Sequence, residues 1–384
     1  MRRIAIVLTT RGNFGKMLST MRAVRARPDL ELKIVVGGGI LHDSYGNFVP
    51  TVEAEGFRVD GTADYLDGNS DDLDSMTRSA GRAVEAFGNT LAALAPDIVV
   101  VIADRYEALS LALAATCRAI PIAHLEGGET SGSIDDRFRH AISKLAQIHL
   151  PATCGAAARL IAMGEAQDRV HVVGSPSIDV IASIRLDELA PLDDYQADHG
   201  TGATLDHRAP FLLVSQHPVV EEHADAESQI AETAAAVAEI GLPTLWVQPN
   251  MDAGAAGVRK AVGQFLDSGS GVPVRVYSSL PLQLYARAMN ACACMVGNSS
   301  SGIREAAYLG VPVVNVGTRQ RDRERGDNVI DVAYKRSELA AAIRIQIARG
   351  RLVSDPIYGD GKSGEKIAAI LARTPLTLDK PATP

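Results

Sequence analysis

Four carboxylates follow two apolar, strand-like runs, and they are the residues of this chain best suited to acid–base chemistry. Asp104 follows the run DIVVVIA, and a second run, IPIAHL, is followed by Glu126, Glu129 and Asp135. Because ligands of open α/β sheets bind at the carboxyl ends of strands, we expect these side chains to meet in one crevice. Neighbouring acids cannot all ionise freely, so their pKa values are pushed apart, as general acid–base catalysis requires.

Helix capping is the alternative explanation for two of these acids. Asp104 precedes an Ala-rich helical stretch, Asp135 precedes RFRHAISKLA, and Asp is a favoured N-cap residue. For either residue alone, capping is the simpler interpretation. The presence of several acids at one edge of a sheet favours catalysis.

The motif GNSSSGIREA, which starts at Gly297, is the second candidate site. It follows the apolar run ACACMV and precedes a predicted helix over 301–309. Free backbone N–H groups, serine hydroxyls and a helix N-terminus together suit a diphosphate, and a carboxylate one turn later suits ribose hydroxyls. A serine-capped helix is the alternative, but three consecutive serines exceed what capping needs. The candidate ligand-binding residues are Ser299, Ser300, Ser301, Gly302 and Glu305.

One histidine and several arginines are further candidates for binding an anion. His217 follows the predicted strand 211–215, where it can carry charge near pH 7 and meet a phosphate or leaving oxygen. The alternative is a histidine in a surface turn. Arg11 ends the first predicted strand. The segment GTRQRDRERGDN, which contains Arg323, forms either a solvated face or the rim of the same site.

Alternating strands and helices predict an α/β protein with two parallel, doubly wound sheets and a cleft between two domains. We place an N-terminal domain with the catalytic acids at 1–180 and a nucleotide-binding domain at 181–384. The acidic, non-periodic segment 185–210 is the predicted connection, and the last helix, about 362–373, is predicted to pack back on the first domain. The predicted strands are 3–9, 32–36, 97–102, 120–125, 148–151 and 170–173, then 211–215, 244–248, 274–277, 293–296 and 313–316.

Composition narrows the possible functions. The 384 residues are 46% hydrophobic and carry a net charge of −8, without the basic face that nucleic-acid binding needs. The N-terminal apolar run is too short for a membrane span, and the four cysteines form no CxxC pair. GDGKSG, from Gly359 to Gly364, lacks the preceding strand of a dinucleotide-binding motif. We therefore expect a cytoplasmic protein with no membrane or nucleic-acid partner, no cofactor and no metal.

Together, five motifs resemble the UDP-N-acetylglucosamine 2-epimerases over nearly the whole chain. They are DRYEA, HLEGGETSGSIDDRFRHAISKLA, SQHP, GNSSSGIREA and GVPVVNVGTRQRDRERGDNV. The resemblance is closest to the hydrolysing, sialic-acid-type branch. It implies two Rossmann-like domains of the glycosyltransferase-B type, a UDP-sugar substrate and a homodimer or homotetramer. By motif, the implied catalytic residues are Asp104, Glu126, Asp135 and His217. The implied substrate- and nucleotide-binding residues are Arg11, Arg105, Ser299, Ser300, Ser301, Gly302, Glu305 and Arg323.

The implied reaction inverts C2 of the sugar by eliminating UDP through a 2-acetamidoglucal and then adding water. Its products are N-acetylmannosamine and UDP, and the sequence leaves open which carboxylate is the acid and which the base. Three alternatives remain. They are an epimerase that retains UDP, a glycosyltransferase of the same architecture, and a nucleotide-sugar sensor without catalysis.

Overall fold

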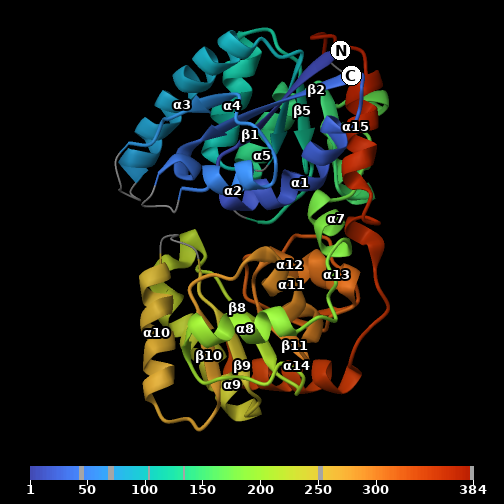
Figure 1. The fold of residues 1–384 in the computed structure, drawn as a ribbon. Helices are drawn as coiled ribbons and strands as arrows, with labels where there is room; N and C mark the ends of the chain where they lie inside the picture. The colour runs from blue at the N-terminus through green and yellow to red at the C-terminus, as the bar shows by residue number, and fades with distance from the viewer. Residues whose placement is uncertain (43–46, 68–72, 103, 133–134, 250–253, 381–384) are drawn as a thin grey trace. The chain divides into compact units, whose positions relative to one another are not determined.

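The computed structural model describes residues 1–42, 47–67, 73–102, 104–132, 135–249 and 254–380. The chain divides into two compact parts. Unit 1 is Met1–Ala182 with Gly359–Pro384, and unit 2 is Ser183–Tyr358 (Figure 1). The sequence-based division had counted residues 359–384 with the second half, whereas the structure groups them with unit 1.

The C-terminal helix α15 (Ser363–Arg373) belongs to unit 1 because it packs on α1 (Arg11–Arg25) and α7 (Pro176–Ala182) (Figure 1). The Asp179 carboxylate of α7 accepts hydrogen bonds from the first two N–H groups of α15, at 2.9 and 2.7 Å. Those groups have no partner within their own helix, so Asp179 fixes where α15 begins.

The sheet of unit 1 is parallel, with the strand order β3-β2-β1-β4-β5-β6 among the described residues. Its central strands are runs of Ile, Val, Leu and Ala that are almost completely buried, as expected where helices cover both faces of a sheet. The strands are β1 (Arg2–Leu8), β2 (Leu30–Gly37), β3 (Gly61–Ala63), β4 (Ile98–Ile102), β5 (Ile122–Leu125) and β6 (Ile148–Leu150).

The remaining helices of this unit are α2 (Val49–Ala54), α3 (Leu73–Leu94), α4 (Tyr106–Cys117), α5 (Asp135–Leu145) and α6 (Cys154–Ala162). The predicted strand 170–173 is wrong. This segment forms only a single bridge, from Val170 to His149 of β6, although the His171 and Val173 N–H groups donate to the His149 and Pro151 carbonyls at 2.9 and 3.0 Å.

Unit 2 has the strand order β13-β12-β11-β8-β9-β10-β7 within the part of the chain that the structure describes. All pairs are parallel except β10 with β7. The strands are β7 (Thr201–Gly202), β8 (Leu212–Ser215), β9 (Thr244–Val247), β10 (Val274–Tyr277), β11 (Cys294–Gly297), β12 (Val313–Val316) and β13 (Val329–Val332). The predicted fold class, two Rossmann-like parallel-sheet domains, is confirmed.

Two expectations for unit 2 need correction. Residues 185–210 are not an irregular connection, because they contain α8 (Ala190–Asp198) and β7, and Leu192 of α8 is buried in the core. The helix predicted over 301–309 is instead two short helices that meet at Arg304. The helices are α9 (Ala226–Ile240), α10 (Ala255–Asp267), α11 (Leu282–Ala291), α12 (Ser300–Ile303), α13 (Glu305–Leu309) and α14 (Arg336–Arg349).

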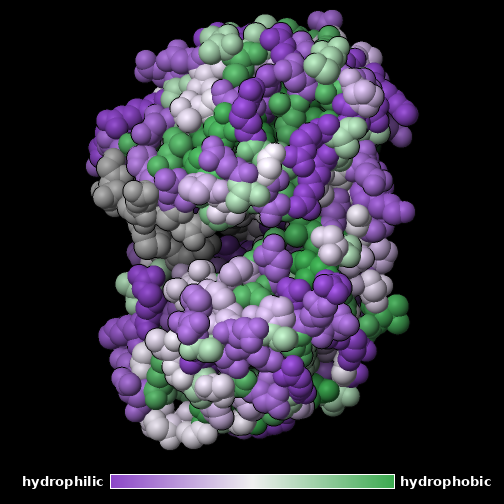
Figure 2. All heavy atoms as spheres, viewed as in Figure 1, coloured by the Kyte–Doolittle hydropathy of each residue, from purple (hydrophilic) through white to green (hydrophobic). Residues whose placement is uncertain are grey.

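Hydrophilic and hydrophobic residues are interspersed over the visible face of each unit (Figure 2). The apolar side chains therefore serve mainly to fill the interior of the two sheets and their helical layers. Among the described helices, none has the length and apolar character that crossing a membrane would need.

A buried ion cluster lies beside the C-terminal end of α5. The Glu165 carboxylate is almost fully buried and accepts bonds from Lys144 Nζ at 2.9 Å, His149 Nε2 at 2.9 Å and Lys380 Nζ at 2.7 Å. Burial by itself would raise the pKa of Glu165, but these three donors outweigh it and lower the pKa to about 2. Glu165 is therefore ionised at every pH at which the protein is expected to work.

This cluster predicts a defined acid sensitivity. The pKa of Glu165 is lower in the folded protein (about 2) than its ordinary value of 4.5, so its charge stabilises the fold above pH 4.5. That stabilisation is lost as the pH falls from 4.5 towards 2. Glu165→Gln should therefore lower the urea midpoint at pH 6 and have a much smaller effect at pH 3. An equal effect at both pH values would contradict the assignment.

Candidate functional site

The predicted acids of unit 1 come together because their strands are neighbours. β4 and β5 pair in parallel, with Ile102 opposite Leu125, so both strands end at the same edge of the sheet. Asp104 follows β4 after one further residue, and Glu126 is the first residue after β5. Both acids therefore lie at the edge of the sheet where α/β proteins bind ligands.

Glu126 sits in a tight and strained turn. Its φ is +61°, which is unusual for a residue with a side chain, and only 4% of its surface is exposed. Gly127 follows, and a Cβ there would lie 2.7 Å from His124 Nδ1. Strain of this kind costs roughly 1–3 kcal/mol and persists where the surrounding structure holds a functional group in place.

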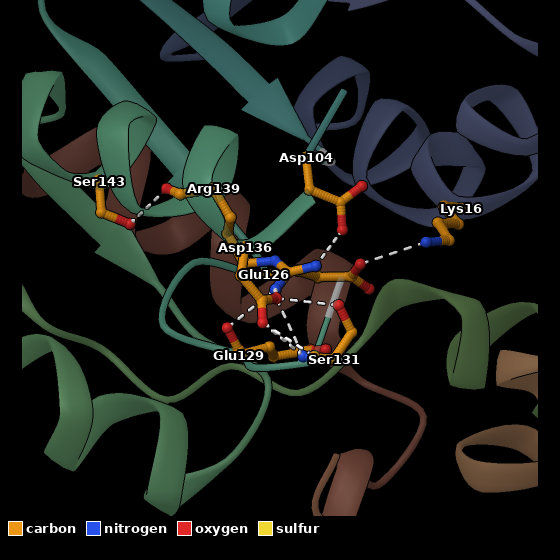
Figure 3. A network of polar contacts seen from close by, with 9 residues as sticks. Lys16, Asp104, Glu126, Glu129, Ser131, Asp136, Arg139 and Ser143 are labelled. Carbon is orange, nitrogen blue, oxygen red and sulfur yellow. Dashed lines mark hydrogen bonds and ion pairs between the residues drawn. The ribbon is translucent and has the colours of Figure 1, made fainter. Parts of the chain in front are cut away.

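Two side chains hold the Glu126 carboxylate. The Ser175 hydroxyl donates to one oxygen at 2.7 Å. Lys16 Nζ of α1 donates to the other at 3.2 Å (Figure 3). The sequence analysis missed both partners. The signal for Lys16 was available, because α1 begins at the end of β1 and β1 is the neighbour of β4.

Arg139 of α5 organises the second acidic group. It is buried, and its guanidinium donates to the carboxylates of Asp104 and Asp136 and, at 2.9 Å, to the Glu129 carbonyl oxygen (Figure 3). Charge-assisted bonds of this kind are stronger than bonds between neutral groups. Arg139 therefore joins the loop after β4 to the loop after β5. The sequence analysis did not single it out.

Asp136 has a structural role in this group. It accepts bonds from the Ser131 and Gly132 backbone N–H groups, both at 2.9 Å, and from the Ser131 hydroxyl. Burial alone would raise the pKa of Asp136, but the Gly132 bond and the Arg139 charge lower it below its ordinary value. Burial likewise acts to lower the pKa of Arg139, yet Asp104 and Glu129 raise it. Both groups are therefore ionised, and Asp136 is poorly suited to proton transfer.

Three other predicted residues of unit 1 have less defined surroundings. Asp135 is half-buried in the first turn of α5, directly before Asp136. Arg105 is more than half exposed and pairs with Glu107 at 3.0 Å, so it lies at the surface in this structure. Arg11 begins α1, and its side chain lies outside the described part of the structure.

The second site forms at the ends of β8 and β11, which are neighbouring parallel strands of unit 2. Asn298 follows β11 and is completely buried. Its side-chain oxygen accepts from the His217 N–H at 2.7 Å, and its side-chain nitrogen donates to the His217 carbonyl at 2.8 Å. Its own carbonyl accepts from Arg319 at 3.0 Å and Gln320 at 3.1 Å. Asn298 therefore connects the serine motif to two loops, the one that contains His217 and the one that contains Arg319 and Gln320.

His217 differs from the expectation of a charged side chain near pH 7. Burial, together with the nearby positive charge of Arg319, lowers its pKa to about 3. In this structure His217 is therefore a neutral imidazole. It can act as a hydrogen-bonding group but not as a cation.

The serine motif contains a local hydrogen-bond chain. The Ser299 hydroxyl lies 2.8 Å from that of Ser301, which lies 2.8 Å from the Tyr285 hydroxyl, and Ser299 caps α12. Gly302 is buried, and a Cβ there would press against Val313 at 3.1 Å. Because α12 is only one turn long, its dipole is small, and an anion would rely on backbone N–H groups and hydroxyls.

The other two predicted residues of the nucleotide site both follow the helix break in the sequence. Glu305 is the first residue of α13, and one of its carboxylate oxygens is buried without a hydrogen bond. Arg323 is buried in the loop after β12.

In the part of the chain that the structure describes, no cluster of three or more His, Cys, Asp or Glu could hold a metal ion.

Gly297→Ala should destabilise unit 2 strongly. Gly297 has φ +133°, and a Cβ there would lie 2.1 Å from the Ser215 carbonyl oxygen of the neighbouring strand. Backbone strain and the clash should together cost about 3 kcal/mol in the free energy of unfolding. Urea unfolding measures this. Gly263→Ala in α10 is the control, because nothing lies within 4 Å of its Cβ and alanine favours a helix. Equal stability of the two variants would contradict the prediction.

Known proteins resemble the chain over almost its whole length. The family model for UDP-N-acetylglucosamine 2-epimerase matches residues 22–372. A UDP-N,N'-diacetylbacillosamine 2-epimerase (hydrolyzing) of Legionella pneumophila is 33% identical over 98% of this chain and 97% of its own. A UDP-N-acetylglucosamine 2-epimerase of Neisseria meningitidis is 30% identical, over 97% of this chain and 95% of its own.

A solved structure shows the same fold. The crystal structure of UDP-GlcNAc 2-epimerase from Neisseria meningitidis bound to UDP-GlcNAc superposes with a TM-score of 0.80, at 17% sequence identity. The match covers 97% of this chain and 100% of the other, and it supports the glycosyltransferase-B type of architecture. With the family model covering most of the chain, these similarities agree with the motifs quoted above. The chain therefore belongs to the UDP-N-acetylglucosamine 2-epimerase family of enzymes.

Proposed function

We propose that this protein is a hydrolysing 2-epimerase that converts UDP-N-acetylglucosamine and water to N-acetylmannosamine and UDP. The observation that carries the proposal is the strained, buried Glu126 turn beside Asp104, at the ligand-binding edge of the sheet. The activities for which the Legionella and Neisseria relatives are named support an epimerase, and that of the Legionella relative supports the hydrolytic outcome.

The first step has to make the C2 hydrogen acidic. C2 is not adjacent to a carbonyl, so direct removal of its proton is difficult. When the C1–O bond breaks, its electron pair leaves with UDP and C1 becomes cationic, which acidifies the C2 hydrogen. A carboxylate then takes that proton, and the C–H electrons form the C1–C2 double bond of a 2-acetamidoglucal. Glu126 and Asp104 are the proposed groups for this proton transfer, with Asp135 as a third candidate.

Unit 2 is proposed to stabilise the departing UDP. Backbone N–H groups and hydroxyls over 299–302 would bind the diphosphate, and the unpaired oxygen of Glu305 would accept a bond from a ribose hydroxyl. His217, being neutral, would donate a hydrogen bond to a phosphate oxygen. Arg323 and Arg11 are further proposed contacts for the nucleotide, and Arg105 for the substrate.

The second step adds water across the double bond. The hydroxyl oxygen bonds to C1, and a proton returns to C2 from the face opposite to the one it left, which inverts that carbon. Two proton-transfer groups on opposite faces are therefore needed. Lys16 touches Glu126 and so can stabilise the anionic form of Glu126, which is the form that accepts a proton. We also propose that the enzyme is a cytoplasmic homodimer or homotetramer.

UDP-N,N'-diacetylbacillosamine is a second candidate substrate, because the Legionella relative is named for it. Incubating the protein with each UDP-sugar alone, without an acceptor, tests both possibilities. Release of UDP together with a free, C2-inverted sugar supports the proposal and identifies the substrate. Conversion with UDP retained indicates the non-hydrolysing reaction. Consumption only after an acceptor is added indicates a glycosyltransferase, and binding without turnover indicates a sensor.

A further inference from the structure

The C-terminal tail, residues 374–380, is attached to unit 1 at defined points after α15 ends. Arg2 donates to the Thr374 carbonyl at 2.7 Å, and Arg169 donates to the Pro375 carbonyl at 3.2 Å. The tail then reaches α5, where Lys380 is only 26% exposed. A lysine this far from the candidate site has no part in the chemistry described above.

Lys380 caps the C-terminal end of α5. Its ammonium lies 2.7 Å from the Ser143 carbonyl oxygen and 2.8 Å from each of the Lys144 and Ala146 carbonyl oxygens. Its fourth contact is the buried Glu165 carboxylate. The last carbonyls of a helix have no partner within the helix, and a cation is favoured there. The tail therefore supplies a cation that bonds the carbonyl groups at the end of α5.

The capped residues continue directly into the acidic site. The Ser143 hydroxyl donates to the Arg139 carbonyl at 3.1 Å and lies 3.0 Å from His124 Nδ1. His124 is fully buried on β5, two residues before Glu126. A Cβ on Gly127 would meet both His124 Nδ1 and the Ser143 hydroxyl, at 2.7 and 3.1 Å. The C-terminal end of α5 is thus packed against the turn that presents Glu126.

We propose that Lys380 is a positioning residue: by fixing the C-terminal end of α5, it sets where Arg139 holds Asp104 and where the Glu126 turn lies. This inference rests on the proposed function, because the affected step is proton transfer in the epimerisation. A closely packed interior transmits small shifts. Both oxygens of the buried Glu165 carboxylate are paired, and these charge-assisted bonds hold the Lys380 ammonium in place beneath α5.

The test compares Lys380→Met with Lys380→Arg and with Lys366→Met. Lys366→Met is the matched control. It also removes an ion pair between a lysine and a carboxylate of unit 1, but the pair, Lys366 with Asp360, is exposed. Lys380→Met should lower kcat about tenfold or more while KM changes less than about twofold, since small displacements of catalytic groups reduce rate. Lys380→Arg, which keeps the charge and donors, should recover most of the rate.

Hydrogen exchange of peptides covering 135–145 provides a readout that needs no turnover. Exchange there should rise at least about fivefold in Lys380→Met, because the helix end loses its cap, and should not change in Lys366→Met. Unchanged kcat, or unchanged exchange in α5, would overturn the proposal. If Lys380→Met does not fold, Lys380→Gln is judged by the same two criteria. If the wild type releases no UDP from a UDP-sugar, the proposed function fails, while the exchange experiment still decides whether Lys380 positions α5.

Discussion

Glu126→Gln should lower kcat by about 10²–10⁴-fold, the range typical of losing a general acid or base. The substitution keeps the size of the side chain, and the amide oxygen can still accept the bond from Ser175 or Lys16. The amide cannot take up or return the C2 proton. Binding of UDP should remain nearly unchanged, because the proposed diphosphate contacts lie in unit 2. UDP release at saturating UDP-sugar and UDP affinity by calorimetry measure the two quantities.

Glu55→Gln is the control for this experiment. Glu55 forms an exposed pair with Arg22 in the same unit, so its loss should leave the rate within about twofold of wild type, as exposed pairs contribute little. A Glu126→Gln variant that is folded and retains more than a tenth of the wild-type rate would exclude Glu126 as a proton-transfer group. Asp104 and Asp135 would then remain as candidates.

Arg139→Met should be the most destabilising single substitution in the candidate site. The substitution removes the guanidinium that Asp104 and Asp136 share, and both carboxylates are largely shielded from water. It also removes the bond to the Glu129 carbonyl. Removing one partner of a buried ion pair costs about 3–5 kcal/mol in the free energy of unfolding. Urea unfolding followed by circular dichroism measures the loss, and turnover should be abolished with it.

Arg137→Met is the matched control, because Arg137 lies one half-turn earlier on the same helix and is exposed. It should change stability by less than about 0.5 kcal/mol. Arg139→Lys keeps the charge but loses the two-pronged geometry, so its stability should lie between those of the wild type and Arg139→Met. If Arg139→Met were as stable as Arg137→Met, the guanidinium would not hold the acidic loops together.

The sequence predicted the sheets well because their strands are continuous apolar runs. Runs such as IVVVI in β4 are buried on both faces, and this burial pattern needs no knowledge of distant parts of the chain. The meeting of Asp104 and Glu126 also followed from the order of these strands. Strand 170–173 was wrong because the tetrapeptide VHVV has the same composition whether or not it completes a ladder at the sheet edge.

The partners of the acids could not be predicted, because they come from distant segments. Ser175 is 49 residues from Glu126, and Arg139 is 35 residues from Asp104. The position of each acid around helix α5 was also ambiguous in the sequence. Asp135 and Asp136 are four and three residues before Arg139, and both spacings place a side chain on the same helix face. Only the structure shows that Asp136 makes the pair with Arg139.

The charge of His217 depends on burial, which a local sequence does not reveal. A histidine after a strand is compatible with a solvated, charged ring, whereas the structure buries it near Arg319 and lowers its pKa. The division of the predicted helix at Arg304 could not be foreseen either, because SSGIREAAYL contains no proline that would mark a break.

The most direct test of the proposed chemistry is the reaction of UDP-N-acetylglucosamine in heavy water, followed by proton NMR. Elimination followed by addition of water predicts free UDP and N-acetylmannosamine with deuterium at C2, because the proton returned to that carbon comes from solvent-exchanged groups. Inverted product that retains its original hydrogen at C2 would contradict the account.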